Sequence, residues 1–198
     1  MTSEIGLGLG QLIIPAAAGL LGVVVGGWTT SHNQKKERKH NHSRQQLECF
    51  YGPLLAMRLQ IRSKSELRAK LHGIANAAWQ ERLDSVRDDP AAMQAVEKAR
   101  GPKFDKVFDY SDEQFRDELI PLYRKMLEHF TQYMWLAEPS TLGHFAALVK
   151  FVELWNRFLA TSLPHEMLEK IDHSEKELEP LYQDLAAQAE RLRQELKK

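Results

Sequence analysis

The sequence predicts an all-α protein, with a single N-terminal transmembrane helix that continues into a basic stalk and then a cytoplasmic helical bundle. Three observations predict this fold class. The chain of 198 residues begins with a long uncharged apolar stretch, and no later stretch alternates apolar and polar residues as a half-buried strand would. Beyond residue 30 there are only five Val and four Ile, whereas the helix-forming residues Leu, Ala, Glu, Lys, Arg and Gln dominate.

The membrane segment is predicted from residues 5–28, which are all uncharged and include Gln11 as the only strongly polar side chain. A helix of that length is about 36 Å long, enough to cross a hydrocarbon core of about 30 Å with some tilt. A secretory signal peptide would need a positively charged segment before its apolar region, and only Met-Thr-Ser-Glu precedes this one. We therefore expect residues 1–30 to form a transmembrane segment.

The orientation of the chain follows from the basic residues after this segment. Residues 31–44 contain five Lys and Arg against Glu37 alone, and basic residues next to a span are retained on the cytoplasmic side. We expect a single-pass protein of the cell membrane, with its N-terminus outside, residues 31–50 as a juxtamembrane stalk and residues 51–198 as the cytoplasmic helical domain. The side chains expected to contact membrane lipid headgroups are Lys35, Lys36, Arg38, Lys39 and Arg44.

Small residues recur on one face of the predicted span. Ala18, Gly22 and Gly26 are spaced four apart, and Gly19 lies on the same face. Such faces let helix backbones approach closely and promote association in lipid. The pattern predicts a homo-oligomer held partly by these four residues.

Proline and glycine pairs predict where the cytoplasmic helices end. We expect Gly52-Pro53 to break or kink the stalk helix, a second helix from about Pro53 to Val86, and a short helix over residues 91–99 that Gly101-Pro102 closes. Ser111 with Gln114 has the spacing of a capping box that opens the next helix. A further helix is expected at about residues 141–161, a short one after Pro164 and a last one after a second capping box at Ser174 and Glu177.

A net charge of zero hides two blocks of opposite charge. Residues 31–72 contain ten Lys and Arg against three Asp and Glu, whereas residues 73–198 contain 17 against 23. Arg58, Arg62 and Arg68 fall within an arc of about 120° on an ideal helix. This face has three possible partners: acidic helices of the same bundle, an acidic protein or neighbouring subunit, or the phosphates of a nucleic acid or nucleotide. Because the chain has no glycine-rich phosphate loop, a nucleotide site would have to be built from side chains.

Catalytic and metal-binding patterns are nearly missing from the sequence. The single Cys49 excludes a disulfide scaffold or a zinc cluster built on thiolates, and no HExxH motif is present, so we predict neither a metal nor a cofactor. The one candidate catalytic pair is Arg124 and His129, in an R-x4-H spacing. This motif resembles the active-site signature of HEPN ribonucleases, which are all-α and usually dimeric. The resemblance implies that Arg124 would stabilise the cleaved phosphate and that His129 would act as the acid–base group.

These patterns favour a non-enzymatic membrane protein that acts by self-association or by binding a partner at the membrane. The layout also resembles that of small membrane-anchored effectors of bacterial defence systems. That resemblance implies an oligomer that perturbs the membrane or forms a pore, with Gln11 as the polar residue available to a lumen. The ribonuclease hypothesis, which depends on Arg124 and His129, is the third alternative.

Overall fold

The computed structural model describes residues 34–168, 170–171 and 173–197, and all the regular structure in these ranges is helical. The all-α prediction is confirmed for this part of the chain. The expected span at residues 5–28 lies outside the described residues, together with its small-residue face of Ala18, Gly19, Gly22 and Gly26. Among the described helices, none is long and apolar enough to cross a membrane.

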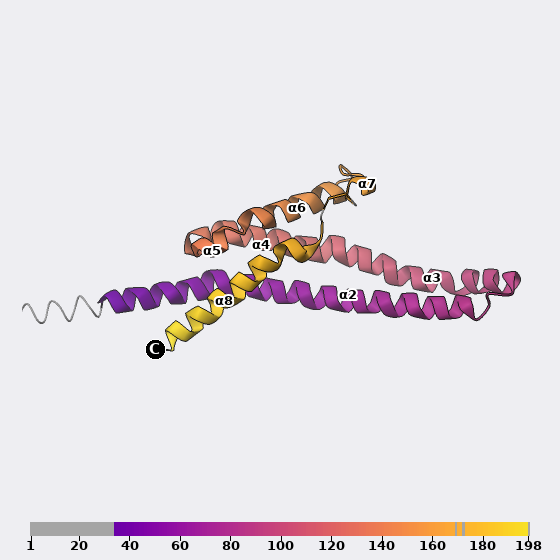
Figure 1. Ribbon diagram of the computed structural model, residues 1–198, viewed down its shortest axis with the longest axis horizontal. Helices are drawn as coiled ribbons and strands as arrows, with labels where there is room; N and C mark the ends of the chain where they lie inside the picture. Colours follow the sequence, from indigo (N-terminus) through magenta and orange to yellow (C-terminus); the bar gives the residue numbers. More distant parts are fainter. Residues whose placement is uncertain (1–33, 169, 172, 198) are drawn as a thin grey trace, which may run out of the picture.

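The described chain begins with one long helical rod. Residues 34–46 are α-helical, the π-helical turn η1 (Leu47–Tyr51) follows, and α2 (Gly52–Asp84) continues in the same direction (Figure 1). At 1.5 Å per residue, a helix over residues 34–84 is about 75 Å long. The expected break at Gly52-Pro53 is therefore wrong, because the helix passes through both residues.

Two π-turns explain how the helices continue through Pro53 and Pro121. A proline inside an α-helix lacks an N–H, and its ring clashes with the carbonyl group four residues earlier. The turn η1 ends two residues before Pro53, and η2 (Phe115–Leu119) ends two residues before Pro121. The wider turn relaxes the backbone at the position where the ring would clash, so the helix changes its hydrogen-bond pattern instead of ending.

Gly52 is required by the close backbone approach at the first π-turn. A Cβ added at Gly52 would lie 2.7 Å from the carbonyl oxygen of Leu47, whereas a Cβ at Gly73 would meet nothing within 4 Å. We expect Gly52→Ala to lower the free energy of unfolding by about 1–3 kcal/mol. Gly73→Ala, in the open part of the same helix, should raise it by up to about 1 kcal/mol. Chemical denaturation followed by circular dichroism measures both, and equal effects would contradict this explanation.

The helix α3 (Pro90–Gln114) returns antiparallel to α2, and the two form a hairpin that projects beyond the rest of the molecule (Figure 1). Asp89 caps α3, since its carboxylate accepts hydrogen bonds from the N–H groups of Ala91 and Ala92 at 3.0 and 3.1 Å. Pro90 occupies the first turn of α3, where a backbone N–H has no partner within the helix, so proline loses no hydrogen bond there.

Two expected boundaries within α3 are wrong. The helix continues through Gly101 and Pro102 instead of closing there. Ser111 does not open a new helix but lies inside α3, where its hydroxyl donates to the carbonyl oxygen of Val107 at 2.8 Å. One continuous helical segment thus extends from Pro90 through η2 to the end of α4.

The remaining elements form a helical body around the middle of the rod. The α4 helix (Ile120–Gln132) is followed by the 3₁₀-helix η3 (Met134–Leu136) and by α5 (Pro139–Leu142), α6 (Phe145–Leu159) and the short α7 (His165–Leu168). The 3₁₀-helix η4 (Glu175–Leu178), with Ser174 at its N-cap, leads into α8 (Glu179–Leu196). The α6 helix packs on α4, and α8 crosses the rod and packs on η1 and α2 (Figure 1).

The core is centred where the rod meets α4 and α8. Phe50 is completely buried and packs edge-on against Phe130 of α4, with ring centroids 5.1 Å apart. The Tyr51 hydroxyl shares a hydrogen bond of 3.0 Å with Thr141, which in turn donates to Asp184 of α8. The expected stalk joins this packing, because Gln46 is buried and its side-chain amide donates to the Leu136 carbonyl oxygen at 2.9 Å.

Candidate functional site

The two candidate catalytic residues, Arg124 and His129, lie on α4 but contact different elements. Arg124 Nε donates to Oδ1 of Asn156 on α6 at 2.7 Å. His129 Nε2 lies 2.8 Å from the carbonyl oxygen of Cys49 in η1. The structure therefore does not bring the two side chains together within one chain.

The contact of His129 follows from the proline at position 53. Pro53 has no N–H to offer the Cys49 carbonyl four residues earlier. A carbonyl oxygen can only accept, so His129 Nε2 carries the proton and donates to it. The His129 ring also packs against Tyr133, with centroids 4.7 Å apart. His129 thus holds α4 against the first π-turn of the rod.

The three arginines of the predicted binding face are paired within the chain. Arg58 forms a 2.9 Å ion pair with Glu175, and Arg62 forms a 2.7 Å pair with Glu66 one turn further along α2. Arg68 Nη2 lies 3.5 Å from the Asp112 carboxylate on α3, and its guanidinium group lies 5.0 Å from the centre of the Phe115 ring. Arg58 and Arg68 therefore join α2 to acidic residues of neighbouring elements.

Arg58 belongs to a polar cluster that fastens α2 to η4 and α8. Its guanidinium group lies 3.8 Å from the centre of the Tyr182 ring, and the Tyr182 hydroxyl donates to Glu175 at 3.0 Å. Burial raises the pKa of Tyr182, and the nearby Glu175 carboxylate raises it further. Burial also raises the pKa of Tyr123. Both hydroxyl groups stay protonated at neutral pH, so the cluster keeps its hydrogen-bond donors.

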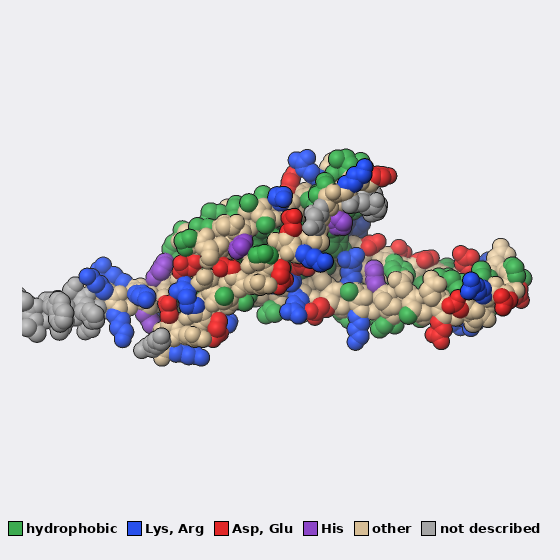
Figure 2. Space-filling model, in the orientation of Figure 1, with side chains coloured by type: hydrophobic (Ala, Val, Ile, Leu, Met, Phe, Trp, Pro, Cys, Tyr) green, Lys and Arg blue, Asp and Glu red, His purple; other side chains and the backbone are tan. Residues whose placement is uncertain are grey.

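The predicted lipid-binding residues lie on the first described helix, residues 34–46. The side chains of Lys35, Lys36, Arg38, Lys39 and Arg44 are all exposed. Figure 2 shows blue basic side chains gathered at this end of the described chain. They are therefore accessible for the headgroup contacts expected from the sequence.

The hairpin carries a row of exposed apolar side chains on α2. Leu67, Leu71 and Ile74 are 57%, 45% and 57% exposed. With Ala78, which is also exposed, they follow the four-three-four spacing of the contact positions in a coiled coil. We call these four residues the α2 stripe.

The α2 stripe is distinct from the seam that joins α2 to α3. The seam contains aromatic contacts between His72 and Phe108 and between Trp79 and Phe104, with ring centroids 5.0 and 5.2 Å apart. At 100° per residue, the middle of the stripe lies about 120° around the helix from these seam residues. The packing of α3 on α2 therefore leaves the stripe uncovered.

A groove runs between the α2 stripe and α3. It has a volume of about 540 Å³, and its lining includes Phe104, Val107, Arg100 and Lys103 from α3. Glu81 lies about 50° around α2 from the middle of the stripe. It is on the side of the stripe that faces away from Arg100 and Lys103. Within the described part of the chain, none of Arg100, Lys103 and Glu81 forms an ion pair.

The four-three-four spacing of apolar residues from Leu67 to Ala78 could have predicted this surface from the sequence. The predicted binding face was based on the arginines of this helix instead, because they form the more conspicuous pattern. No protein family model, curated protein or solved structure matches this chain. A functional assignment therefore depends on the surfaces of the molecule itself.

Proposed function

We propose that this chain is a single-pass membrane-anchored protein that acts by self-association, without catalysis, and that the α2–α3 hairpin provides a contact between copies. The observation that supports this most directly is the α2 stripe. Three large apolar side chains that are about half exposed and aligned on one helix face are typical of a protein contact surface. A second copy of this chain is the occupant we propose for it.

The expected membrane anchor favours a parallel arrangement. The predicted span ends at about residue 28, and the described rod begins at residue 34. Copies anchored in one membrane would carry their rods in the same direction. A two-fold axis along the rods would then place Leu71 and Ile74 of one copy against the same residues of the other.

Charge complementarity supports this arrangement. With such an axis, α3 of one copy lies on the same side of the dimer as the edge of the second copy's α2 that faces away from its own α3. Arg100 and Lys103 would there approach Glu81 of the second copy. Arg100, Lys103 and Glu81, which form no ion pair within the described chain, would thus pair between copies.

The molar mass of the full-length protein in mild detergent tests this proposal. Light scattering behind size exclusion is expected to give a dimer or a larger multiple of the 22.8 kDa chain. A monomer at every protein concentration would contradict self-association and leave a different protein as the occupant of the stripe.

The alternatives expected from the sequence gain no comparable support. The small-residue face that a pore would use lies outside the described residues. Arg124 and His129 bond to Asn156 and Cys49 rather than to each other, so no geometry favours the ribonuclease. An acidic protein or a nucleic acid would have to displace the short ion pairs of Arg58 and Arg62.

A further inference from the structure

A second surface feature lies at the base of the hairpin, where it meets α6 and the segment after α7. It is a pocket of about 570 Å³, within the range typical of small-molecule sites. Its lining comes from α2, α3, η2, α6, α7 and the segment after α7, and it includes Arg68, Asp112, Phe115, Arg116, Trp155 and His173. The α2 stripe is not part of it.

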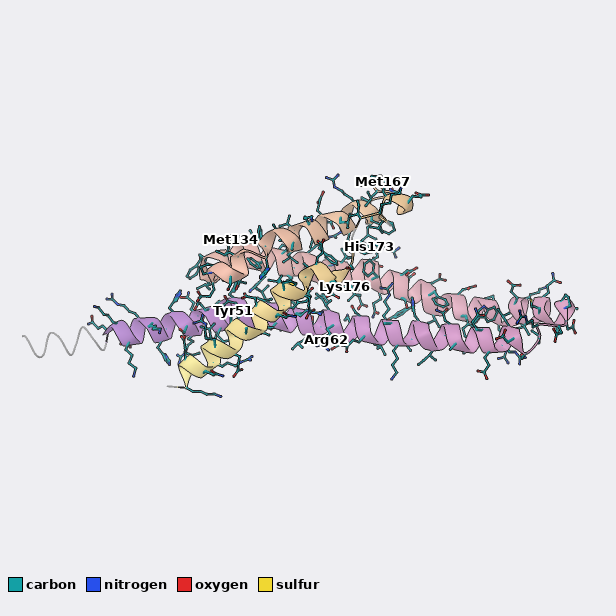
Figure 3. The ribbon with its side chains drawn as sticks, in the orientation of Figure 1. Tyr51, Arg62, Met134, Met167, His173 and Lys176 are labelled. Atoms are coloured by element: carbon teal, nitrogen blue, oxygen red, sulfur yellow. The ribbon has the colours of Figure 1, made fainter. Side chains whose placement is uncertain are left out.

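Aromatic rings form one side of this pocket. The Trp155 ring packs against Phe115, with centroids 4.5 Å apart, and against Phe158 at 5.7 Å. His173 lies 5.8 Å from Trp155, and Figure 3 labels it in the segment that joins α7 to α8. Such ring faces and edges suit a planar aromatic ligand.

Two residues of the pocket lining carry a hydrogen-bond donor that has no acceptor in the described part of the chain. Arg68 Nε and Trp155 Nε1 are both buried and have no hydrogen-bond partner among the described residues. Both atoms can donate but cannot accept. A buried donor without an acceptor is unfavourable, so these two side chains would be stabilised by turning toward an oxygen atom supplied by a ligand.

The charges around the pocket favour an anion. The ion pair between Arg68 and Asp112 is long, at 3.5 Å, and the Asp112 side chain is 78% exposed. Asp112 can therefore turn into solvent and leave the Arg68 guanidinium group to another carboxylate or phosphate. Arg116, which is paired with Asp117, adds a second cation to the lining.

We propose that this pocket binds a small molecule that combines a planar aromatic ring with an anionic oxygen group. The ring packs among Phe115, Trp155 and Phe158, and the anion accepts hydrogen bonds from Arg68 and Trp155. Aromatic carboxylates and nucleoside phosphates both have this chemistry. The inference does not depend on self-association through the stripe.

Isothermal titration calorimetry on the full-length protein in detergent tests the proposal with two anionic probes, indole-3-acetate and adenosine monophosphate. Each has an uncharged counterpart, indole-3-acetamide and adenosine. We expect at least one anion to bind about tenfold more tightly than its counterpart. Arg68→Gln should weaken that binding about tenfold, and Trp155→Phe, which keeps a ring but removes the N–H, should weaken it several-fold.

Matched variants separate this site from general effects of charge and aromatic content. Arg157→Gln changes an exposed arginine on α6, and Trp135→Phe changes an exposed tryptophan on η3; neither should alter binding. Binding of one probe alone supports the proposal and assigns the ligand class. Binding of neither probe, equal binding of the uncharged counterparts, or affinity unchanged in Trp155→Phe and in any folded Arg68→Gln protein would overturn the proposal.

Discussion

Replacing Leu71 and Ile74 together with Asp is expected to convert the full-length protein to a smaller species by light scattering. In the proposed dimer these two side chains pack against the same residues of the second copy and are no longer exposed to water. Each buried Leu or Ile contributes about 1.5–3 kcal/mol, and a carboxylate there would have to be desolvated. The affinity between copies should fall at least about 100-fold. The isolated chain should still fold, because both side chains are about half exposed in it.

Two comparisons show which surface is responsible for any change in mass. Leu59→Asp alters a residue of α2 that is 62% exposed but lies outside the four-three-four spacing, and it should leave the mass unchanged. Gly22→Leu with Gly26→Leu tests the predicted span separately. If only the glycine variant reduces the mass, the hairpin part of the proposal is wrong.

Phe50→Ala is expected to reduce the stability of the chain more than Gly52→Ala does. Phe50 is fully buried, and its ring contacts Tyr51 at 4.9 Å and Phe130 at 5.1 Å between centroids. Removing a buried phenyl group leaves a cavity and should lower the free energy of unfolding by about 3–5 kcal/mol. Urea denaturation followed by circular dichroism measures this value.

Trp135→Ala is the matched control for Phe50→Ala. It also removes a large aromatic ring, but Trp135 is 62% exposed, so its loss should cost less than about 1 kcal/mol. Similar losses in the two variants would contradict the central place of Phe50 in the core. Phe50 lies in the expected stalk. A large loss of stability in Phe50→Ala would therefore show that this segment is part of the folded body.

The sequence was sufficient to predict an all-α fold, but it did not predict where the helices end. Pro53, Pro102 and Pro121 each reduce local helix propensity, which is why the sequence alone predicts a break or kink at Gly52-Pro53 and a helix end at Gly101-Pro102. Phe50 and Leu54 beside Pro53, and Leu119 and Ile120 beside Pro121, are buried in the core. Packing close to these two prolines holds the helix together, and the π-turns relieve the local clash.

The candidate sites depended on contacts far apart in the sequence. Arg58 and Arg68 could be expected to pair with acidic helices, because the charge blocks are visible along the chain. The partner of His129 is the backbone of Cys49, 80 residues earlier, and no local pattern reveals it. Likewise, only the folded hairpin shows that α3 covers the seam at His72 and Trp79 and leaves the α2 stripe open.

Disulfide crosslinking at the α2 stripe tests parallel self-association most directly. The full-length protein with Cys49→Ser would carry a single new cysteine at Ala78 or, as a matched control, at Ala77, which is also exposed but points about 100° away. Under mild oxidation in membranes, Ala78→Cys is predicted to form a disulfide-linked dimer efficiently, and Ala77→Cys is not. The absence of a crosslink at position 78, or equal crosslinking at both positions, would contradict the proposal.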